Sequence, residues 1–350
     1  MNRNAVAISS SVLFVVFAAI LVLTPAPYVT WRPGQPIDVL GETDQGPVIG
    51  VDGVETHDAS GSLLLTLVST SKVDTTVSLP EAMLVYFSEG SDAMPRDLIY
   101  PPGKSDDEIT QEAVASMDTS RDNAIVAALR AAGIPVTERP MVSTVVVNGP
   151  SGEQLQPGDL IVEINGKPVE TTADVAELIG STNVGTVINL KVLRGGKEHK
   201  ADVTTVASSQ DPSRAIIGIG LAVGYEYAPK VTYGLSSDIV GPSAGLVFAL
   251  GIYDKITAGK LMGDLTVAGT GEIDPSGQVR AIGGIQEKMT GAEKEGATVF
   301  LLPKDNCEAV GDFKTTMRLV PVSTLRDAIA SLQYILSLIH ISEPTRLLSI

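Results

Sequence analysis

The chain has 350 residues, of which 44% are hydrophobic, so it is long and apolar enough to bury the cores of two or three domains. Its formal net charge of -16 argues against nucleic-acid binding and against electrostatic binding to an anionic membrane surface, since both need a basic face. The single cysteine, Cys307, excludes an internal disulfide and a zinc site built from several thiolates. We therefore expect no cofactor, no metal and no nucleic-acid partner.

The N-terminal segment 5–23 contains no charged residue. At 1.5 Å per residue a helix over this segment spans about 28 Å, close to the thickness of the hydrocarbon layer of a bilayer. A cleaved signal peptide is the alternative, but the nearest cleavage candidate, Thr24-Pro25-Ala26, is followed by Pro27. The pattern favours a single-pass anchor in the cell membrane, with residues 1–4 in the cytoplasm and the rest of the chain outside it.

Residues 24–45 are rich in proline and glycine and indicate a linker, and residues 46–138 indicate an α/β segment. The first turn of one expected helix holds three acidic residues, which the helix dipole favours. The expected elements are a buried strand at 62–69, an element of undecided type at 82–87, a helix that begins at Ser105, and another over 121–132.

Short strands alternate with turns after residue 139. Strands are expected at 142–147, 160–164, 187–193 and 199–206, with a helix over 172–179. The run 155–166, which ends in the tight-turn pair Asn165-Gly166, resembles the core of a PDZ domain of the protease-associated kind. The resemblance covers residues 139–207 and implies a β-rich domain that binds extended peptides at a sheet edge. The alternative is a β-rich spacer that binds nothing.

A serine within Gly241-Pro242-Ser243-Ala244-Gly245 is the first candidate for chemistry. The pentapeptide lies between an expected strand, 230–235, and an apolar helix, 243–252. Free N–H groups at the start of that helix would stabilise an oxyanion, and the flanking glycines would let a substrate backbone approach. The alternative is a serine that only caps the helix.

The same pentapeptide fits Gly-x-Ser-x-Gly, the nucleophile turn of α/β-hydrolases. That fold requires a histidine after the serine, and here the only one is His340, near the C-terminus. A Ser–His hydrolase of small esters is therefore disfavoured. Lysine is the remaining common partner for a serine nucleophile.

Lys288 is the candidate base. It lies in an expected helix that begins near Gly283, beside an apolar stripe formed by Ile285, Met289 and Ala292, while Glu287 and Lys294 fall on another face. Burial would lower the pKa of Lys288 toward 7, as a general base requires. The alternative is a lysine whose stem is packed and whose amine reaches water.

Four blocks, 241–245, 269–273, 277–279 and 282–288, resemble the proteolytic domain of the Lon family. The resemblance covers residues 215–332. It implies that Ser243 is the nucleophile, that Lys288 is its base and that Thr270 helps to position the lysine. Val240 stands where the family commonly carries an acidic residue, and Asp238 cannot be equated with that residue.

The chain also departs from Lon proteases proper, which carry an ATPase. Gly103-Lys104-Ser105 ends like a P-loop, but Leu98 stands where the first glycine is required. The whole layout resembles the bacterial membrane-anchored Lon-like serine proteases that contain a PDZ domain. That resemblance implies an α+β multidomain fold, polypeptide substrates cleaved without ATP, and a homo-oligomeric ring. The alternative function is a non-catalytic membrane-anchored adaptor whose PDZ-like domain binds peptides.

Residues 333–350 have no counterpart in the family pattern. The run 338–346, Leu-Ile-His-Ile-Ser-Glu-Pro-Thr-Arg, resembles the translated read-through of a sequencing adapter. A genuine short apolar extension is the alternative. No function is expected from this tail.

Overall fold

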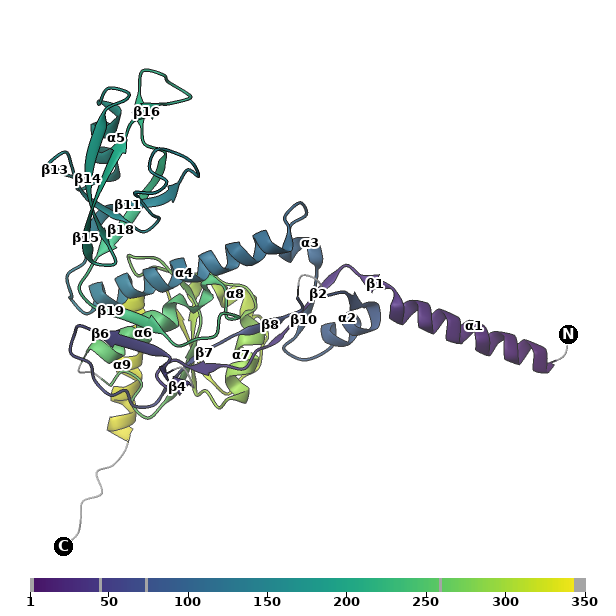
Figure 1. The fold of residues 1–350 in the computed structure, drawn as a ribbon. Helices are drawn as coiled ribbons and strands as arrows, with labels where there is room; N and C mark the ends of the chain where they lie inside the picture. The colour runs from purple at the N-terminus through teal and green to yellow at the C-terminus, as the bar shows by residue number, and fades with distance from the viewer. Residues whose placement is uncertain (1–2, 44–45, 73–74, 258–259, 343–350) are drawn as a thin grey trace, which may run out of the picture. The chain divides into compact units, whose positions relative to one another are not determined.

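The computed structural model describes residues 3–43, 46–72, 75–257 and 260–342, with the backbone alone described for 339–342 (Figure 1). The chain forms two compact units. One is discontinuous in sequence and comprises Met1–Gly133 and Pro229–Ile350; we call it the discontinuous unit. The other, Ile134–Ala228, lies between these two segments in sequence, and we call it the inserted unit.

A five-stranded sheet forms the centre of the discontinuous unit, in the order β24-β23-β20-β7-β3. The first four strands of this order are parallel and β3 is antiparallel to β7. β7 comes from the segment before the inserted unit, yet it pairs along its length with β20, which comes from the segment after it. The strand bounds are β3 Ile37–Asp38, β7 Ser62–Leu65, β20 Thr266–Gly269, β23 Val299–Pro303 and β24 Arg318–Val322.

This pairing joins the segment 46–138 to residues that follow the inserted unit. The segment 46–138 is not an independent part of the fold, because β7 completes the sheet of the predicted proteolytic region. The side chain of Thr66 strengthens the junction by donating a hydrogen bond of 2.9 Å to the carbonyl of Gly269. Hydrophobic periodicity cannot reveal a pairing between segments that are so distant in the sequence.

Helices pack around this sheet. The stripe predicted for the Lys288 helix is buried: Ile285, Met289 and Ala292 pack against a core that includes Phe300 and Leu302 of β23. The helices of the discontinuous unit are α1 Arg3–Leu23, α2 Leu79–Tyr86, α3 Arg96–Ile99, α4 Asp106–Ala131, α6 Gly245–Ile256, α7 Ile285–Lys294, α8 Cys307–Val310 and α9 Leu325–Ser342, with 3-10 turns η1 Pro242–Ala244 and η2 Lys304–Asn306.

α4 is one continuous helix where two were expected. Ser105 caps it in a capping box with Glu108, and the helix continues through the polar stretch 116–120. Met117 and Ser120 are buried there, and α4 packs along α6. Tertiary packing thus outweighs the weak helix propensity of this stretch. The undecided element at 82–87 is also helical, as part of α2, and the strand expected at 62–69 is divided into β7 and β8.

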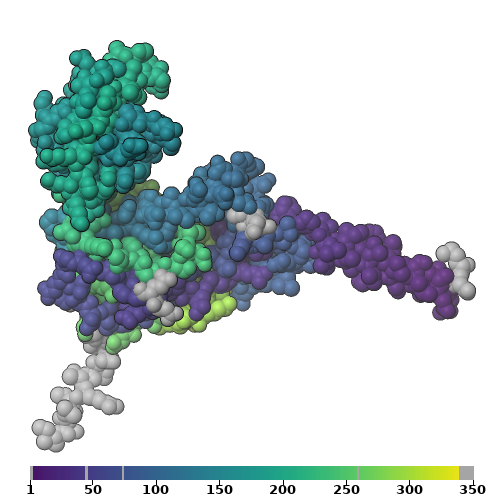
Figure 2. Space-filling model, viewed as in Figure 1, coloured from purple at the N-terminus to yellow at the C-terminus, as the bar shows by residue number. Residues whose placement is uncertain are grey.

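α1 is the one helix in the described part of the chain that is long and apolar enough to cross a membrane. None of its residues is buried, and Figure 2 shows it as a purple rod that the rest of the chain leaves uncovered. A membrane anchor and a signal sequence share these properties.

The discontinuous unit also contains small sheets besides the central one. Their strands are β1 Pro25–Ala26 with β9 Val77–Ser78, β10 Asp92–Pro95 with β2 Tyr28–Pro33 and β8 Val68–Thr70, β4 Glu42–Thr43 with β5 Gly46–Pro47, β6 Ile49–Asp52 with β19 Lys230–Tyr233, and β21 Glu272–Ile273 with β22 Val279–Arg280.

The inserted unit is a sheet in the order β15-β14-β12-β11-β18, with β13 beside β12 and α5 packed near it. β18 pairs with β11 from Thr137↔Glu226 to Val145↔Ile219, so this unit extends beyond the expected end at 207, into residues expected to begin the proteolytic region. The bounds are β11 Thr137–Val145, β12 Leu160–Ile164, β13 Lys167–Pro168, α5 Thr172–Gly180, β14 Val187–Arg194, β15 Lys197–Thr204, β16 Val206–Ala207, β17 Ala215–Ile216 and β18 Ile219–Glu226.

A buried ion pair stabilises the inserted unit. Asp159 is only 1% exposed, and its two carboxylate oxygens accept hydrogen bonds of 2.7 Å from Nε and Nη2 of Arg194. We expect Arg194→Met to lower the free energy of unfolding of this unit by about 1–3 kcal/mol, because it removes the guanidinium from a buried carboxylate. Lys191→Met, which breaks the more exposed pair with Glu163, is the control and should have a clearly smaller effect. Denaturant unfolding measures both; equal losses would contradict the prediction.

α9 continues past the expected end of the family pattern. Leu332 and Ile335 are buried, so the helix still contributes to the core where the tail 333–350 was expected to begin. The part of that tail from 343 to 350 lies outside the described residues.

Candidate active site

Ser243 lies in the single 3-10 turn η1, directly before α6. Gly241 precedes the turn with a φ of 105°, a conformation that favours glycine. Gly245 begins α6 so close to its neighbours that a Cβ there would lie 2.8 Å from Ile273 and 2.9 Å from the Ser120 hydroxyl. Backbone conformation at Gly241 and internal packing at Gly245 thus account for the two flanking glycines, and close approach of a substrate backbone stays a prediction.

Lys288 extends from α7 to Ser243. Its Nζ lies 2.8 Å from Ser243 Oγ and 3.1 Å from Thr270 Oγ1, within hydrogen-bonding distance of both. The lysine is 4% exposed, and burial lowers its pKa to about 7, against a smaller opposing effect of the Glu287 charge. The structure thus brings the three residues singled out in the sequence into one cluster.

Thr270 follows β20 and joins the serine to the lysine. Its hydroxyl donates to the backbone carbonyl of Ser243 at 3.2 Å, and the N–H of Gly271 donates to the same carbonyl at 2.9 Å. The N–H of Leu246 in turn donates to the carbonyl of Gly271. These bonds fix the turn that carries Ser243 against the end of a central strand.

Glu287 differs from its expected position. The helical pattern put it on a face away from the buried stripe, with Lys294, but Glu287 is only 6% exposed whereas Lys294 is exposed. α7 packs against β2 as well as against the core, which covers a second face of the helix. Burial raises the pKa of Glu287, and the nearby negative charge of Asp92 raises it further.

The backbone at Ser243 offers donors for a developing negative charge. Pro242 has no N–H, and the N–H groups at the start of a helical turn have no acceptor within the turn. The N–H of Gly245, by contrast, already bonds to the carbonyl of Pro242. The N–H groups of Ser243 and Ala244 are thus the candidates for an oxyanion site.

A groove of about 690 Å³ opens beside the serine. β8, the edge strand of its sheet, forms one wall, and the indole of Trp31 packs closely on Gly283 and Gly284 before α7. Its charged residues besides Lys288 are acidic, and Val240 lines the groove together with Asp238. The groove is lined by Trp31, 66–70, Tyr100, 238–240, Pro242, Ser243, Glu272, 281–283 and Lys288.

The sequence did not single out the N-terminal contribution to this groove. Trp31, residues 66–70 and Tyr100 all precede the inserted unit and lie outside the four motif blocks. The only sequence signal was the apolar run at 62–69, which was interpreted as a buried strand and not as part of a site.

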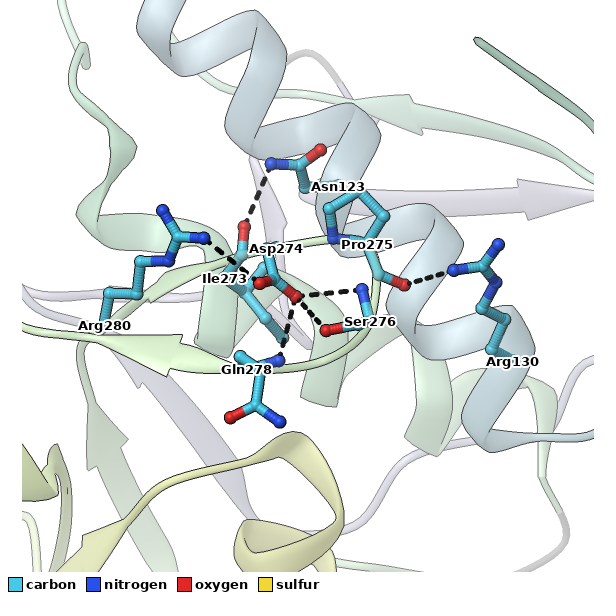
Figure 3. Close-up of polar contacts among 8 residues, drawn as sticks. All are labelled: Asn123, Arg130, Ile273, Asp274, Pro275, Ser276, Gln278 and Arg280. Atoms are coloured by element: carbon cyan, nitrogen blue, oxygen red, sulfur yellow. Dashed lines mark hydrogen bonds and ion pairs between the residues drawn. The ribbon is translucent and has the colours of Figure 1, made fainter. Parts of the chain in front are cut away.

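α4 supports the site from behind. Ser120 Oγ donates to the carbonyl of Pro242 at 2.9 Å, beside the serine. Figure 3 shows two further bonds to the turn that follows β21: Asn123 Nδ2 donates to the Ile273 carbonyl at 3.0 Å and Arg130 Nη1 to the Pro275 carbonyl at 3.0 Å. Asp274 fixes the shape of this turn, because one of its oxygens accepts from the N–H and the hydroxyl of Ser276 and from the N–H of Gln278, while Arg280 contacts the other.

We expect Ser120→Ala to lower kcat about three- to tenfold with little change in KM. The substitution removes a hydrogen bond that orients the turn of Ser243 and leaves the groove unchanged. Thr119→Ala is the matched control, because the Thr119 hydroxyl bonds only within α4 and is exposed. Steady-state proteolysis assays measure both. A change in KM alone, or an equal effect of both substitutions, would contradict this role of Ser120.

Among the described residues, no group of three or more His, Cys, Asp or Glu side chains is placed to hold a metal ion.

Comparisons with known proteins agree with both predicted modules. Residues 116–205 match the PDZ domain family, and residues 237–334 match the Lon protease (S16) C-terminal proteolytic domain. The PDZ match begins inside α4, before the compact inserted unit.

Individual relatives cover only parts of the chain. It is 37% identical over 93 residues to the Lon protease of Clostridium beijerinckii (25% of this chain, 11% of that protein) and 36% identical over 91 residues to Lon protease 2 of Bacillus subtilis (26% and 16%). It is 35% identical over 81 residues to a probable periplasmic serine endoprotease DegP-like of Pseudomonas putida (23% and 17%). The chain thus spans less than a fifth of the length of each of these three proteins.

Among solved structures, the PDZ domain of an SdrC-like protein from Listeria monocytogenes matches with 28% identity, over 24% of this chain and 87% of that one, with a TM-score of 0.23.

Proposed function

We propose that this chain, whose segments match a PDZ domain and a Lon-type proteolytic domain, is a membrane-anchored serine endopeptidase with a Ser243–Lys288 dyad that works without ATP. The observation that carries the proposal is the buried Lys288 amine, 2.8 Å from the Ser243 hydroxyl, with a pKa lowered to about 7. A lysine with such a pKa is partly neutral near neutral pH and is then able to accept a proton.

The proposed reaction has two halves. Neutral Lys288 takes the hydroxyl proton as Ser243 Oγ attacks a peptide carbonyl, and the N–H groups at η1 stabilise the oxyanion. Protonated Lys288 then gives its proton to the leaving amine, which leaves an acyl-enzyme on Ser243. In the second half Lys288 activates a water molecule, which hydrolyses the ester and restores the serine.

Thr270 has a positioning role in this scheme. Its hydroxyl oxygen accepts a hydrogen bond of 3.1 Å from the Lys288 amine. One N–H of the neutral amine is thereby held by the threonine, and the lone pair of the amine is left for the serine hydroxyl. The hydrogen bond that the threonine donates to the Ser243 carbonyl fixes the position of the nucleophile relative to the base.

The groove favours extended polypeptides as substrates. The free edge of β8 runs along it and offers backbone groups to which a peptide can add as a strand. A folded domain cannot supply such a strand, and the chain shows no complete P-loop to drive unfolding. We therefore propose unfolded or flexible proteins as substrates, with the PDZ domain recognising peptides or regulating cleavage.

The setting of the reaction is part of the proposal. α1 anchors the chain once in the cell membrane, and the proteolytic domain lies on the extracytoplasmic side. A homo-oligomeric ring is proposed by resemblance to Lon-type domains.

The test uses the full chain in detergent or lipid nanodiscs, incubated with unfolded casein without nucleotide. We expect cleavage by the unchanged protein, the same rate after ATP is added, and none by Ser243→Ala with its circular dichroism unchanged. Cleavage that persists in Ser243→Ala would contradict the dyad. Absence of cleavage by the unchanged protein, despite native folding and peptide binding, would favour the non-catalytic adaptor.

A further inference from the structure

Outside α1, exposed apolar side chains are concentrated on and just after α2. Leu84 is 70% exposed and Phe87 77%, and Met83 and Tyr86 are also more than half exposed. Tyr86 and Phe87 contact each other edge to face. We call these four residues, Met83, Leu84, Tyr86 and Phe87, the α2 patch. Soluble proteins seldom leave such a contiguous apolar surface without a partner.

α2 also has a buried apolar face, which is distinct from the α2 patch. Ala82 and Val85 are buried, and α2 packs against β2 and β10 through its inner face. The α2 patch lies outside that contact, so its side chains are not needed to complete the core. The polar residue of this helix, Glu81, is turned toward Arg32, with which it forms an ion pair.

The topology places the α2 patch beside α1. α1 ends at Leu23, and β1 follows at once. β1 pairs with β9 through Pro25↔Ser78 and Ala26↔Val77, and Ser78 is the N-cap of α2. α2 therefore begins next to the point where the chain leaves α1, and the two helices are in contact.

We propose that the α2 patch enters the interfacial layer of the bilayer beside α1 and so holds the proteolytic groove close to the membrane surface. The inference rests on the proposed anchor, because its argument is the continuity of the patch with α1. The aromatic and aliphatic side chains of the patch fit apolar insertion, and the nearby Arg32 is paired with Glu81. The net charge of -16 does not favour electrostatic attraction to anionic lipids.

The consequence concerns the substrate. β2 follows β1 directly, and its Trp31 lines the groove only eight positions after Leu23, the last residue of α1. Eight residues span at most about 29 Å even when fully extended. The Trp31 side of the groove thus lies within this distance of the end of α1, and the favoured substrates are flexible segments exposed close to the membrane, such as the flanks of membrane-spanning helices.

The test uses the full chain in phosphatidylcholine vesicles, with Cys307→Ser to remove the native thiol. An environment-sensitive dye is attached to a cysteine at position 87 (Phe87→Cys) or, as the control, at position 334 (Tyr334→Cys). Tyr334 is an exposed aromatic residue on α9, which Figure 1 places at the end of the discontinuous unit away from α1. We expect lipids brominated near the headgroup to quench the dye at position 87 at least twofold more than at position 334, and aqueous iodide to show the reverse order.

Equal lipid quenching at both positions would overturn the inference while α1 still holds the protein on floated vesicles. A dye at position 87 that is shielded from iodide but not quenched by lipid would also overturn it, in favour of contact with a second copy of the chain. Failure of the protein to float with the vesicles would contradict both the proposed membrane anchor and this inference. Casein cleavage, measured on the same samples, reports the proposed peptidase activity separately from all of these outcomes.

Discussion

Lys288→Met is expected to lower kcat/KM for an unfolded substrate by at least about 10³-fold, because it removes the only described base that contacts Ser243 Oγ. Methionine fills a similar volume in the buried site, so the fold should persist. Oxyanion stabilisation and substrate binding remain in the variant, so a small residual activity is expected.

Lys294→Met is the matched control. Lys294 is on the same helix as Lys288 but is exposed, so its loss should change kcat/KM less than about twofold. Both variants are compared in one casein assay, with thermal unfolding measured to show that each is folded. Activity within tenfold of the unchanged protein in Lys288→Met would contradict the dyad.

The pH dependence of proteolysis is the second large effect. Only neutral Lys288 accepts the serine proton, and burial lowers its pKa to about 7. kcat/KM should therefore rise with pH, reach a plateau above about pH 8, and fall roughly tenfold for each unit below the pKa. A profile that stays flat between pH 5 and 8 would contradict a lysine base with this pKa.

Glu287→Gln provides an independent check of the decrease in kcat/KM at low pH, the acidic limb of the profile. The negative charge of Glu287 raises the pKa of Lys288, against the larger effect of burial. Removing that charge should shift the acidic limb of the kcat/KM profile to lower pH, by less than about one unit. Glu295→Gln, an exposed change on the residue that ends α7, is the control and should leave the limb in place. A shift to higher pH in Glu287→Gln would show that another group controls the limb.

The motif blocks predicted the cluster of Ser243, Thr270 and Lys288 without any structure. Ser243 and Thr270 lie in glycine-containing segments at element ends, and Lys288 lies in a helix that two glycines precede, so each position carries a local sequence signal. The buried stripe of α7 could also be predicted from the sequence, because its apolar residues repeat with helical periodicity. The structure shows these residues in contact, and their catalytic roles remain a proposal for experiment.

The rest of the site could not be predicted from the sequence, for physical reasons. β7 joins β20 across the inserted unit, and β8 and Trp31 reach the groove only as a result of this pairing. The polar bonds from Ser120 and Asn123 to the turns around Ser243 and Ile273 likewise join distant segments. Glu287 looked exposed because helical periodicity shows the faces of one helix and not what covers each face.

The most direct test of the dyad is covalent labelling of the full chain with a peptidyl phosphonate, with the modified residue located by peptide mass spectrometry. We expect a label on Ser243, a labelling rate that rises with pH through about 7, and a rate at least about 10²-fold lower in Lys288→Met. Labelling of a different residue, or labelling of Ser243 at the same rate in Lys288→Met, would contradict the dyad.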